Sequence, residues 1–88
     1  MNLIVDIGNT VAKIAVFADT GIVEVVYDSN AGLEHLLEVC RRYSCDKAIV
    51  ATVIDLSEQA LAQLASLPVP LLWLDEKTPL PVENLYET

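Results

Sequence analysis

Residues 3–13 read LIVDIGNTVAK, which is two apolar runs interrupted by Gly8-Asn9-Thr10. The runs, 3–7 and 11–17, are short and rich in β-branched side chains, and the second contains one charge, Lys13. A Gly-Asn pair between two such runs is typical of a β-hairpin turn. The segment therefore predicts two antiparallel strands joined by a tight turn.

A third strand is predicted after a second turn signal, Asp19-Thr20-Gly21. Residues 22–28 alternate, with one face formed by Val23, Val25 and Tyr27 and the other by Glu24 and Asp28. We expect a half-exposed edge strand whose acidic side chains protect it against unwanted pairing. The first three strands then form an antiparallel meander.

The apolar period changes beyond residue 28 from that of a strand to that of a helix. Ser29 or Asn30 can cap the start of this helix, whose apolar stripe continues to about residue 43. Residues 47–53 are a continuous β-branched run, as expected of a strand that is covered on both faces.

A second helix and a fifth strand complete the pattern. Asp55 followed by Glu58 is an acidic version of a capping box, and Pro68 ends the helix. Residues 69–74 predict the fifth strand, in which Trp73 is expected to belong to the core.

The element order β-β-β-α-β-α-β predicts a mixed five-stranded α/β sheet with the first strand central and helices flanking it. Each strand-helix-strand step is expected to be a right-handed crossover to a parallel neighbour. This is the arrangement of a ribonuclease-H-like, or actin-like ATPase, half-domain. We predict that the half-domain covers residues 1–77 and that residues 78–88 begin a linking segment to the remainder of an enzyme.

Length and charge limit the function classes. The chain has 88 residues, with 13 acidic against five basic side chains and a net charge of −8. One small domain is expected, without room for a two-lobed cleft. The acidic excess argues against nucleic acid or an anionic membrane as a partner. The sequence has no signal peptide and no apolar run of the ~20 residues that a spanning helix needs, so a cytoplasmic location is expected.

Three side chains that often bind metals or undergo redox chemistry are interpreted as structural. Cys40 and Cys45 have no partner pair with metal-ligand spacing and are expected to be reduced packing residues. His35 has no second ligand candidate one helical turn away, so we expect an exposed structural histidine.

Asp6 is the residue that a simple hairpin does not explain. A carboxylate in a central strand costs free energy unless hydrogen bonds, a cation or water compensates for its desolvation. At a strand end beside a turn it suits a hydrated Mg²⁺ next to phosphates. Gly8 permits close approach of a phosphate, and Lys13 is the only Lys or Arg in the first 40 residues.

These residues resemble the first phosphate-binding motif of the acetate and sugar kinase/Hsp70/actin superfamily, and the chain most resembles type III pantothenate kinase. The resemblance is carried by the Asp6 to Lys13 segment, by Ile49-Val50-Ala51-Thr52-Val53 and by Asn84-Leu85-Tyr86-Glu87-Thr88.

The resemblance implies that ATP is bound, with Asp6 as the Mg²⁺ ligand and Tyr86 in contact with pantothenate. The implied cofactor-binding residues are Asp6, Ile7, Gly8, Asn9, Thr10, Val11, Ala12 and Lys13. It further implies ATP-dependent phosphorylation of pantothenate in the first step of coenzyme A biosynthesis, by a homodimer that needs a monovalent cation, K⁺ or NH₄⁺.

The family's Gly-x-Asp-Arg stretch, which holds the catalytic base, is expected beyond Thr88, so no catalytic residue is expected within the chain. These 88 residues are therefore predicted to be an N-terminal fragment that is inactive alone. Two alternatives stay open. One is a non-catalytic, self-associating module, and the other is a member of the same superfamily with a different substrate, such as a sugar or acetate kinase or a chaperone-like ATPase.

Overall fold

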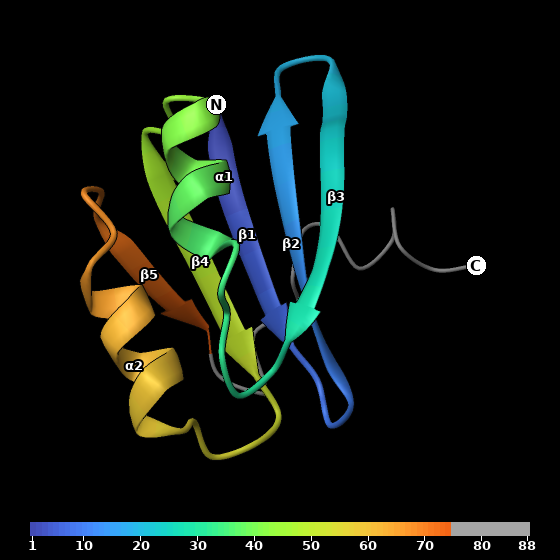
Figure 1. The fold of residues 1–88 in the computed structure, drawn as a ribbon. Helices are drawn as coiled ribbons and strands as arrows, with labels where there is room; N and C mark the ends of the chain where they lie inside the picture. The colour runs from blue at the N-terminus through green and yellow to red at the C-terminus, as the bar shows by residue number, and fades with distance from the viewer. Residues whose placement is uncertain (75–88) are drawn as a thin grey trace.

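The computed structural model describes residues 1–74, and its element order is the predicted β-β-β-α-β-α-β (Figure 1). The elements are β1 (Asn2–Ile7), β2 (Val11–Ala18), β3 (Gly21–Ser29), α1 (Leu36–Arg42), β4 (Lys47–Thr52), α2 (Glu58–Ala65) and β5 (Leu71–Leu74). The predicted linking segment at 78–88 and the predicted substrate contact at Tyr86 lie outside these residues. Within residues 1–74, neither helix is long and apolar enough to cross a membrane.

The five strands form one mixed sheet in the order β3-β2-β1-β4-β5. β1 pairs antiparallel with β2, and β2 with β3, because tight turns join them. β1 pairs parallel with β4, and β4 with β5, across the two helical connections. The predicted central position of β1 and the mixed topology are confirmed.

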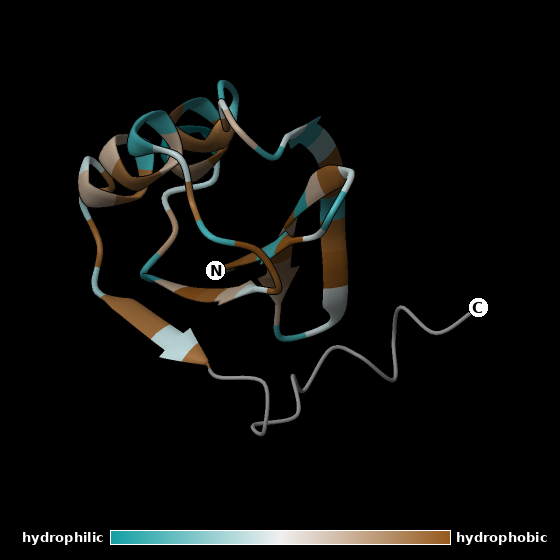
Figure 2. Ribbon diagram, turned by 90° about the horizontal axis from the view of Figure 1, so that it is seen from below, coloured by the Kyte–Doolittle hydropathy of each residue, from teal (hydrophilic) through white to brown (hydrophobic). Residues whose placement is uncertain are grey.

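Both helices lie on the same face of the sheet, as the two perpendicular views show (Figures 1 and 2). We call this the helix-covered face. The core between the sheet and the helices contains the fully buried side chains of Leu3, Val5, Ile7, Ile14, Val16, Leu36 and Val50. Burial of each such side chain contributes roughly 1.5–3 kcal/mol, which is the main stabilising term of a domain this small.

The opposite face of the sheet carries no helix within residues 1–74, and we call it the open face. A smaller apolar cluster lies on it, in which Ile4 is 4% exposed and packs against Phe17, Ile49, Ala51 and Leu74. The prediction that the fourth strand is covered on both faces is therefore wrong for the described part of the chain. Ile49 and Ala51 are only half-buried.

The predicted faces of the third strand are reversed. Asp28, expected on the exposed side, is 7% exposed, whereas Tyr27 is 63% exposed. Glu24 is half-buried and accepts hydrogen bonds from Tyr43 and Arg42 of the α1 region. The acidic side of β3 faces α1 because its carboxylates receive hydrogen bonds there, and the apolar side faces solvent.

The first helix begins later than predicted, at Leu36, with His35 at its N-cap. The Ser29 hydroxyl accepts from the Ala31 and Gly32 N–H groups, so it closes a turn and caps no helix. Leu33 has a φ of 49°, which a continuous right-handed helix does not permit.

Two further local predictions are wrong. The N-cap of α2 is Ser57, whose hydroxyl accepts from the Ala60 N–H at 3.0 Å, whereas Asp55 is exposed and caps nothing. Trp73 is 48% exposed because, among residues 1–74, β5 is an edge strand that pairs only with β4.

Candidate functional site

Asp6 and Lys13 lie directly opposite each other in the antiparallel β1–β2 pair. Both side chains are half-buried and belong to the open face, since their neighbours Ile7 and Ala12 are fully buried toward the helices. The hairpin therefore presents a carboxylate and an ammonium group side by side. Ile7 and Ala12, two of the predicted binding residues, have their side chains in the core, so only their backbone can contact a ligand.

Lys13 also contacts the third strand. Tyr27 is its partner in the β2–β3 register, and the Lys13 Nζ lies 5.9 Å from the centre of the Tyr27 ring. This distance is within the range of a cation–π interaction, which restrains the lysine over the sheet. The sequence alone identified Tyr27 only as a strand residue, because the contact depends on the register of β3.

The turn itself is compact. The Gly8 N–H donates to the Val11 carbonyl at 3.0 Å, and Asn9 and Thr10 are exposed. A Cβ on Gly8 would lie 3.3 Å from the Val11 oxygen, and the backbone of Gly8 is not in the left-handed region. Glycine is favoured here by the close approach of the backbone and not by its φ angle.

Asn30 fixes this turn from outside. Its side-chain Nδ2 donates to the carbonyl oxygens of Gly8 and Asn9, at 3.0 Å each. The sequence suggested Asn30 as a helix cap. It could not identify the contact with the turn, because the two bonded residues lie 21 and 22 positions away in the sequence. This residue is the main part of the candidate site that the sequence did not reveal.

The loop that carries Asn30 is held in turn by α2. The Ser57 hydroxyl donates to the Ala31 carbonyl at 2.6 Å, and the Gln59 Nε2 donates to the Gly32 carbonyl at 3.4 Å. The Val53 N–H donates to the Ile7 carbonyl at 3.1 Å. The carboxyl ends of β1, β3 and β4 thus meet at one edge of the sheet, which is where ligands commonly bind in α/β sheets.

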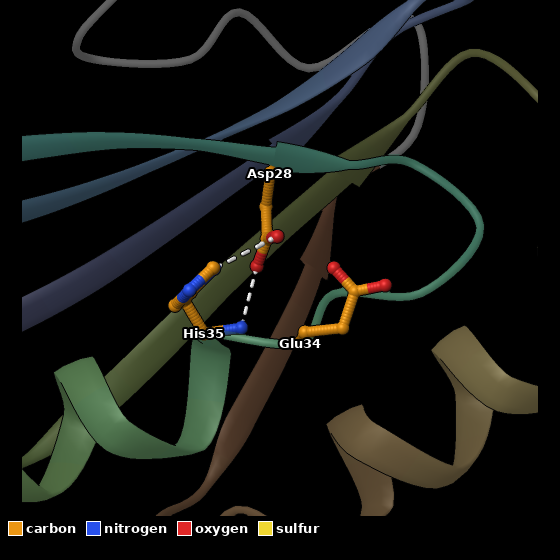
Figure 3. Close-up of side chains that lie close together, drawn as sticks. All are labelled: Asp28, Glu34 and His35. Atoms are coloured by element: carbon orange, nitrogen blue, oxygen red, sulfur yellow. Dashed lines mark hydrogen bonds and ion pairs between the residues drawn. The ribbon is translucent and has the colours of Figure 1, made fainter.

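A second cluster, Asp28, Glu34 and His35, lies where β3 leads into α1 (Figure 3). The Asp28 Oδ2 accepts from the His35 N–H at 2.7 Å, and its Oδ1 accepts from the Ser29 N–H and lies 3.1 Å from the His35 Nδ1. The three side chains are of types that bind cations, with ligand atoms within 4.8 Å of one another. The hydrogen bonds from Ser29 and His35 already explain the position of the Asp28 carboxylate, so we interpret the cluster as a helix cap.

The pKa values of Asp28 and His35 in this cap are shifted in opposite directions. Burial raises the pKa of Asp28, but the hydrogen bonds from His35 and Ser29 outweigh burial and hold that pKa below its usual value. The hydrogen bond that the Asp28 carboxylate accepts from the His35 ring, and then the charge of Asp28, raise the pKa of His35. The His35 side chain is 58% exposed, as predicted, but its acidic partner was missed.

The two cysteines behave as predicted. Cys40 and Cys45 are both free and buried, and burial raises the pKa of each thiol. Neither is therefore activated as a thiolate nucleophile.

A carboxylate, a lysine and a compact turn at the carboxyl end of a central strand are groups that can hold a divalent cation and phosphate. The mixed sheet with these groups on its first hairpin is consistent with an actin-like ATPase half-domain.

Known proteins match the chain along all 88 residues. It is 69% and 68% identical to the type III pantothenate kinases of two strains of Bacteroides fragilis, and 48% identical to that of Phocaeicola vulgatus. The match covers the whole of this chain and 36% of the length of each relative. No protein-family model matches the chain. The resemblance to type III pantothenate kinase is confirmed, and the chain spans about a third of such a kinase, as predicted for a fragment.

Proposed function

We propose that these 88 residues supply the ATP-phosphate-binding hairpin of a pantothenate kinase, which transfers the γ-phosphate of ATP to pantothenate in the first step of coenzyme A biosynthesis. The observation that carries this proposal is 69% identity to a type III pantothenate kinase across the whole chain, hairpin included. The pairing of Asp6 with Lys13 on the open face supports the same role.

Asp6 suits a Mg²⁺ ligand because its carboxylate is half-buried at the end of a central strand. Mg²⁺ in such sites keeps several waters and takes one or two protein carboxylates together with substrate phosphates. The ion would neutralise charge on the transferred phosphoryl group. Lys13, one strand away, would contribute a fixed positive charge to the same group.

Asn9 and Thr10 would contact the phosphates through their backbone N–H groups, and Gly8, whose own N–H is bonded to Val11, would permit the close approach of the phosphates. The other predicted binding residues have smaller parts, since Ile7 and Ala12 are buried and Val11, although 45% exposed, has no polar side-chain atom. The proposed contacts are therefore concentrated on Asp6, the turn and Lys13.

Further properties of the parent kinase rest on the resemblance. We propose a half-domain over 1–77 that continues through 78–88, a pantothenate contact at Tyr86, a homodimer dependent on K⁺ or NH₄⁺, and a cytoplasmic location. The chain alone is expected to be inactive, because phosphoryl transfer needs both substrates positioned against each other.

The test uses a chimera in which these 88 residues replace the matching segment of the Bacteroides fragilis relative. Asp6→Asn should keep the far-UV circular dichroism of the parent chimera and lower turnover by at least about 100-fold, as expected for loss of a group that stabilises transition-state charge. Turnover is followed as phosphopantothenate formed from ATP and pantothenate.

Asp19→Asn, at the exposed turn between β2 and β3, is the matched control and should leave turnover unchanged. Full activity of Asp6→Asn would overturn the role of Asp6. Phosphorylation of acetate or a sugar in place of pantothenate would overturn the proposed substrate.

A further inference from the structure

The side chain of Asn30 holds two consecutive peptide groups of the β1–β2 turn. One amide nitrogen, which carries two hydrogens, donates to the Gly8 carbonyl and to the Asn9 carbonyl at 3.0 Å each. Because both acceptors are carbonyl oxygens, the group that faces them must be the NH₂ and not the side-chain oxygen.

By holding the two carbonyl groups, this contact also fixes the direction of the N–H groups in the same peptide units. In a planar trans peptide the carbonyl and the following N–H point in opposite directions. With the carbonyls of Gly8 and Asn9 held toward Asn30, the N–H groups of Asn9 and Thr10 point away from it. Within residues 1–74 neither N–H has a hydrogen-bond acceptor, whereas the N–H of Gly8 is bonded to Val11.

Two successive unbonded N–H groups at an exposed turn form a small concavity that attracts anions. The turn follows Asp6 and precedes Lys13, the groups proposed to bind phosphate and Mg²⁺. The loop that carries Asn30 is itself anchored to α2 through Ser57 and Gln59. The side chain therefore acts from a fixed support.

We propose that Asn30 is a positioning residue that orients the Asn9 and Thr10 N–H groups toward the phosphates of ATP. This inference rests on the proposed function and adds to it a residue outside the phosphate-binding hairpin. Asn30 does not touch the nucleotide in this arrangement, because its amide faces the carbonyl side of the turn.

The test compares Asn30→Ala and Asn30→Asp with the parent chimera described above. Asn30→Ala removes the donor, and Asn30→Asp places a carboxylate against two carbonyl oxygens at nearly unchanged volume. We expect the KM for ATP to rise by about tenfold for Asn30→Ala and further for Asn30→Asp, with the KM for pantothenate within about twofold of the parent. Affinity for Mg²⁺-tripolyphosphate, measured by calorimetry, should fall in the same order.

Asp19→Asn is the matched control, since Asp19 lies at the exposed β2–β3 turn, away from both the β1–β2 turn and the loop that carries Asn30, and it should leave both KM values unchanged. Equal losses for ATP and pantothenate, an unchanged KM for ATP, or unfolding of both Asn30 variants would each overturn the positioning role. If the parent chimera binds neither MgATP nor Mg²⁺-tripolyphosphate, the proposed function and this inference both fail. An active parent with a normal Asn30→Ala variant would overturn the inference alone.

Discussion

The two hairpin turns at opposite ends of β2 use glycine for different reasons. At the β2–β3 turn, Gly21 has a φ of 126°, and a Cβ placed there would meet nothing within 4 Å. At the β1–β2 turn, Gly8 has no unusual φ but lies against the Val11 carbonyl, and its own carbonyl is bonded to Asn30. One turn is shaped by its own backbone, and the other is shaped by contacts with a distant loop.

The difference separates a turn that only reverses the chain from one that we propose presents groups to a ligand. A self-contained turn depends on a local dihedral angle and little else. A turn fixed from outside keeps its peptide groups in one orientation when an anion approaches, so less ordering is needed on binding. The comparison predicts that substitutions at the β2–β3 turn change mainly the free energy of unfolding, whereas substitutions at the β1–β2 turn also change the affinity for ATP.

The largest expected effect on stability concerns the acids near the two turns. Asp28→Ala removes the acceptor of two N–H groups and the partner of the His35 ring, and should lower the free energy of unfolding by roughly 2–3 kcal/mol. Asp19→Ala, at the exposed turn, should change it by less than about 0.5 kcal/mol. Urea unfolding of the 88-residue chain measures the unfolding free energy of each variant. Equal losses for Asp28→Ala and Asp19→Ala would contradict the expected difference between the two ends of the sheet.

An intermediate effect is expected from alanine at the two glycines. Gly21→Ala forces a side chain into a φ of 126° and should cost about 1–2 kcal/mol of unfolding free energy without changing ATP binding. Gly8→Ala should cost less stability, since only a 3.3 Å contact must relax, but should weaken ATP binding by the chimera. Paired denaturation and calorimetry test this crossed pattern, and a parallel response of the two variants would contradict it.

The smallest effect concerns pH. The lowered pKa of Asp28 gives stability that is present above its unfolded pKa of about 3.9 and lost as pH falls through the folded value. The raised pKa of His35 gives stability that is present below its unfolded pKa of about 6.5 and lost as pH rises through the folded value. The urea midpoint should therefore fall slightly from pH 6 to pH 8.

The His35→Asn variant should lose this decline between pH 6 and pH 8. At the other end of the sheet, the hydrogen bond with Asp46 raises the pKa of the Met1 amine above 8.0, so its contribution is lost only at higher pH. The two ends should thus respond in separate pH ranges. A decline that persists in His35→Asn would show that the cap is not its source.

The sequence was sufficient for features that depend on local patterns. Alternation and turn residues predicted the meander, and two strand-helix-strand steps predicted β1 at the centre, which the sheet order confirms. The pairing of Asp6 with Lys13 follows directly from the hairpin.

Features that depend on distant partners could not be predicted in this way. From the sequence, Asp28 is expected to be an exposed acidic residue of a strand. It is buried because the folded chain places the His35 N–H, at the start of α1, within hydrogen-bond distance of its carboxylate. Asn30 serves a turn that only the assembled sheet places beside it. Trp73 belongs to an apolar strand, which predicts burial. The strand lies at the edge of the sheet formed by residues 1–74, and this position, which leaves Trp73 exposed, depends on the whole fold.

The exposure of Trp73 has a practical consequence. The sequence contains one tryptophan, and this side chain is 48% exposed on the edge strand β5. Indole emission shifts to the blue when water is removed from around the ring. The tryptophan emission of the chain, excited selectively beyond the absorption of its three tyrosines, therefore reports on the β5 edge of the sheet and on any molecule that binds against β5.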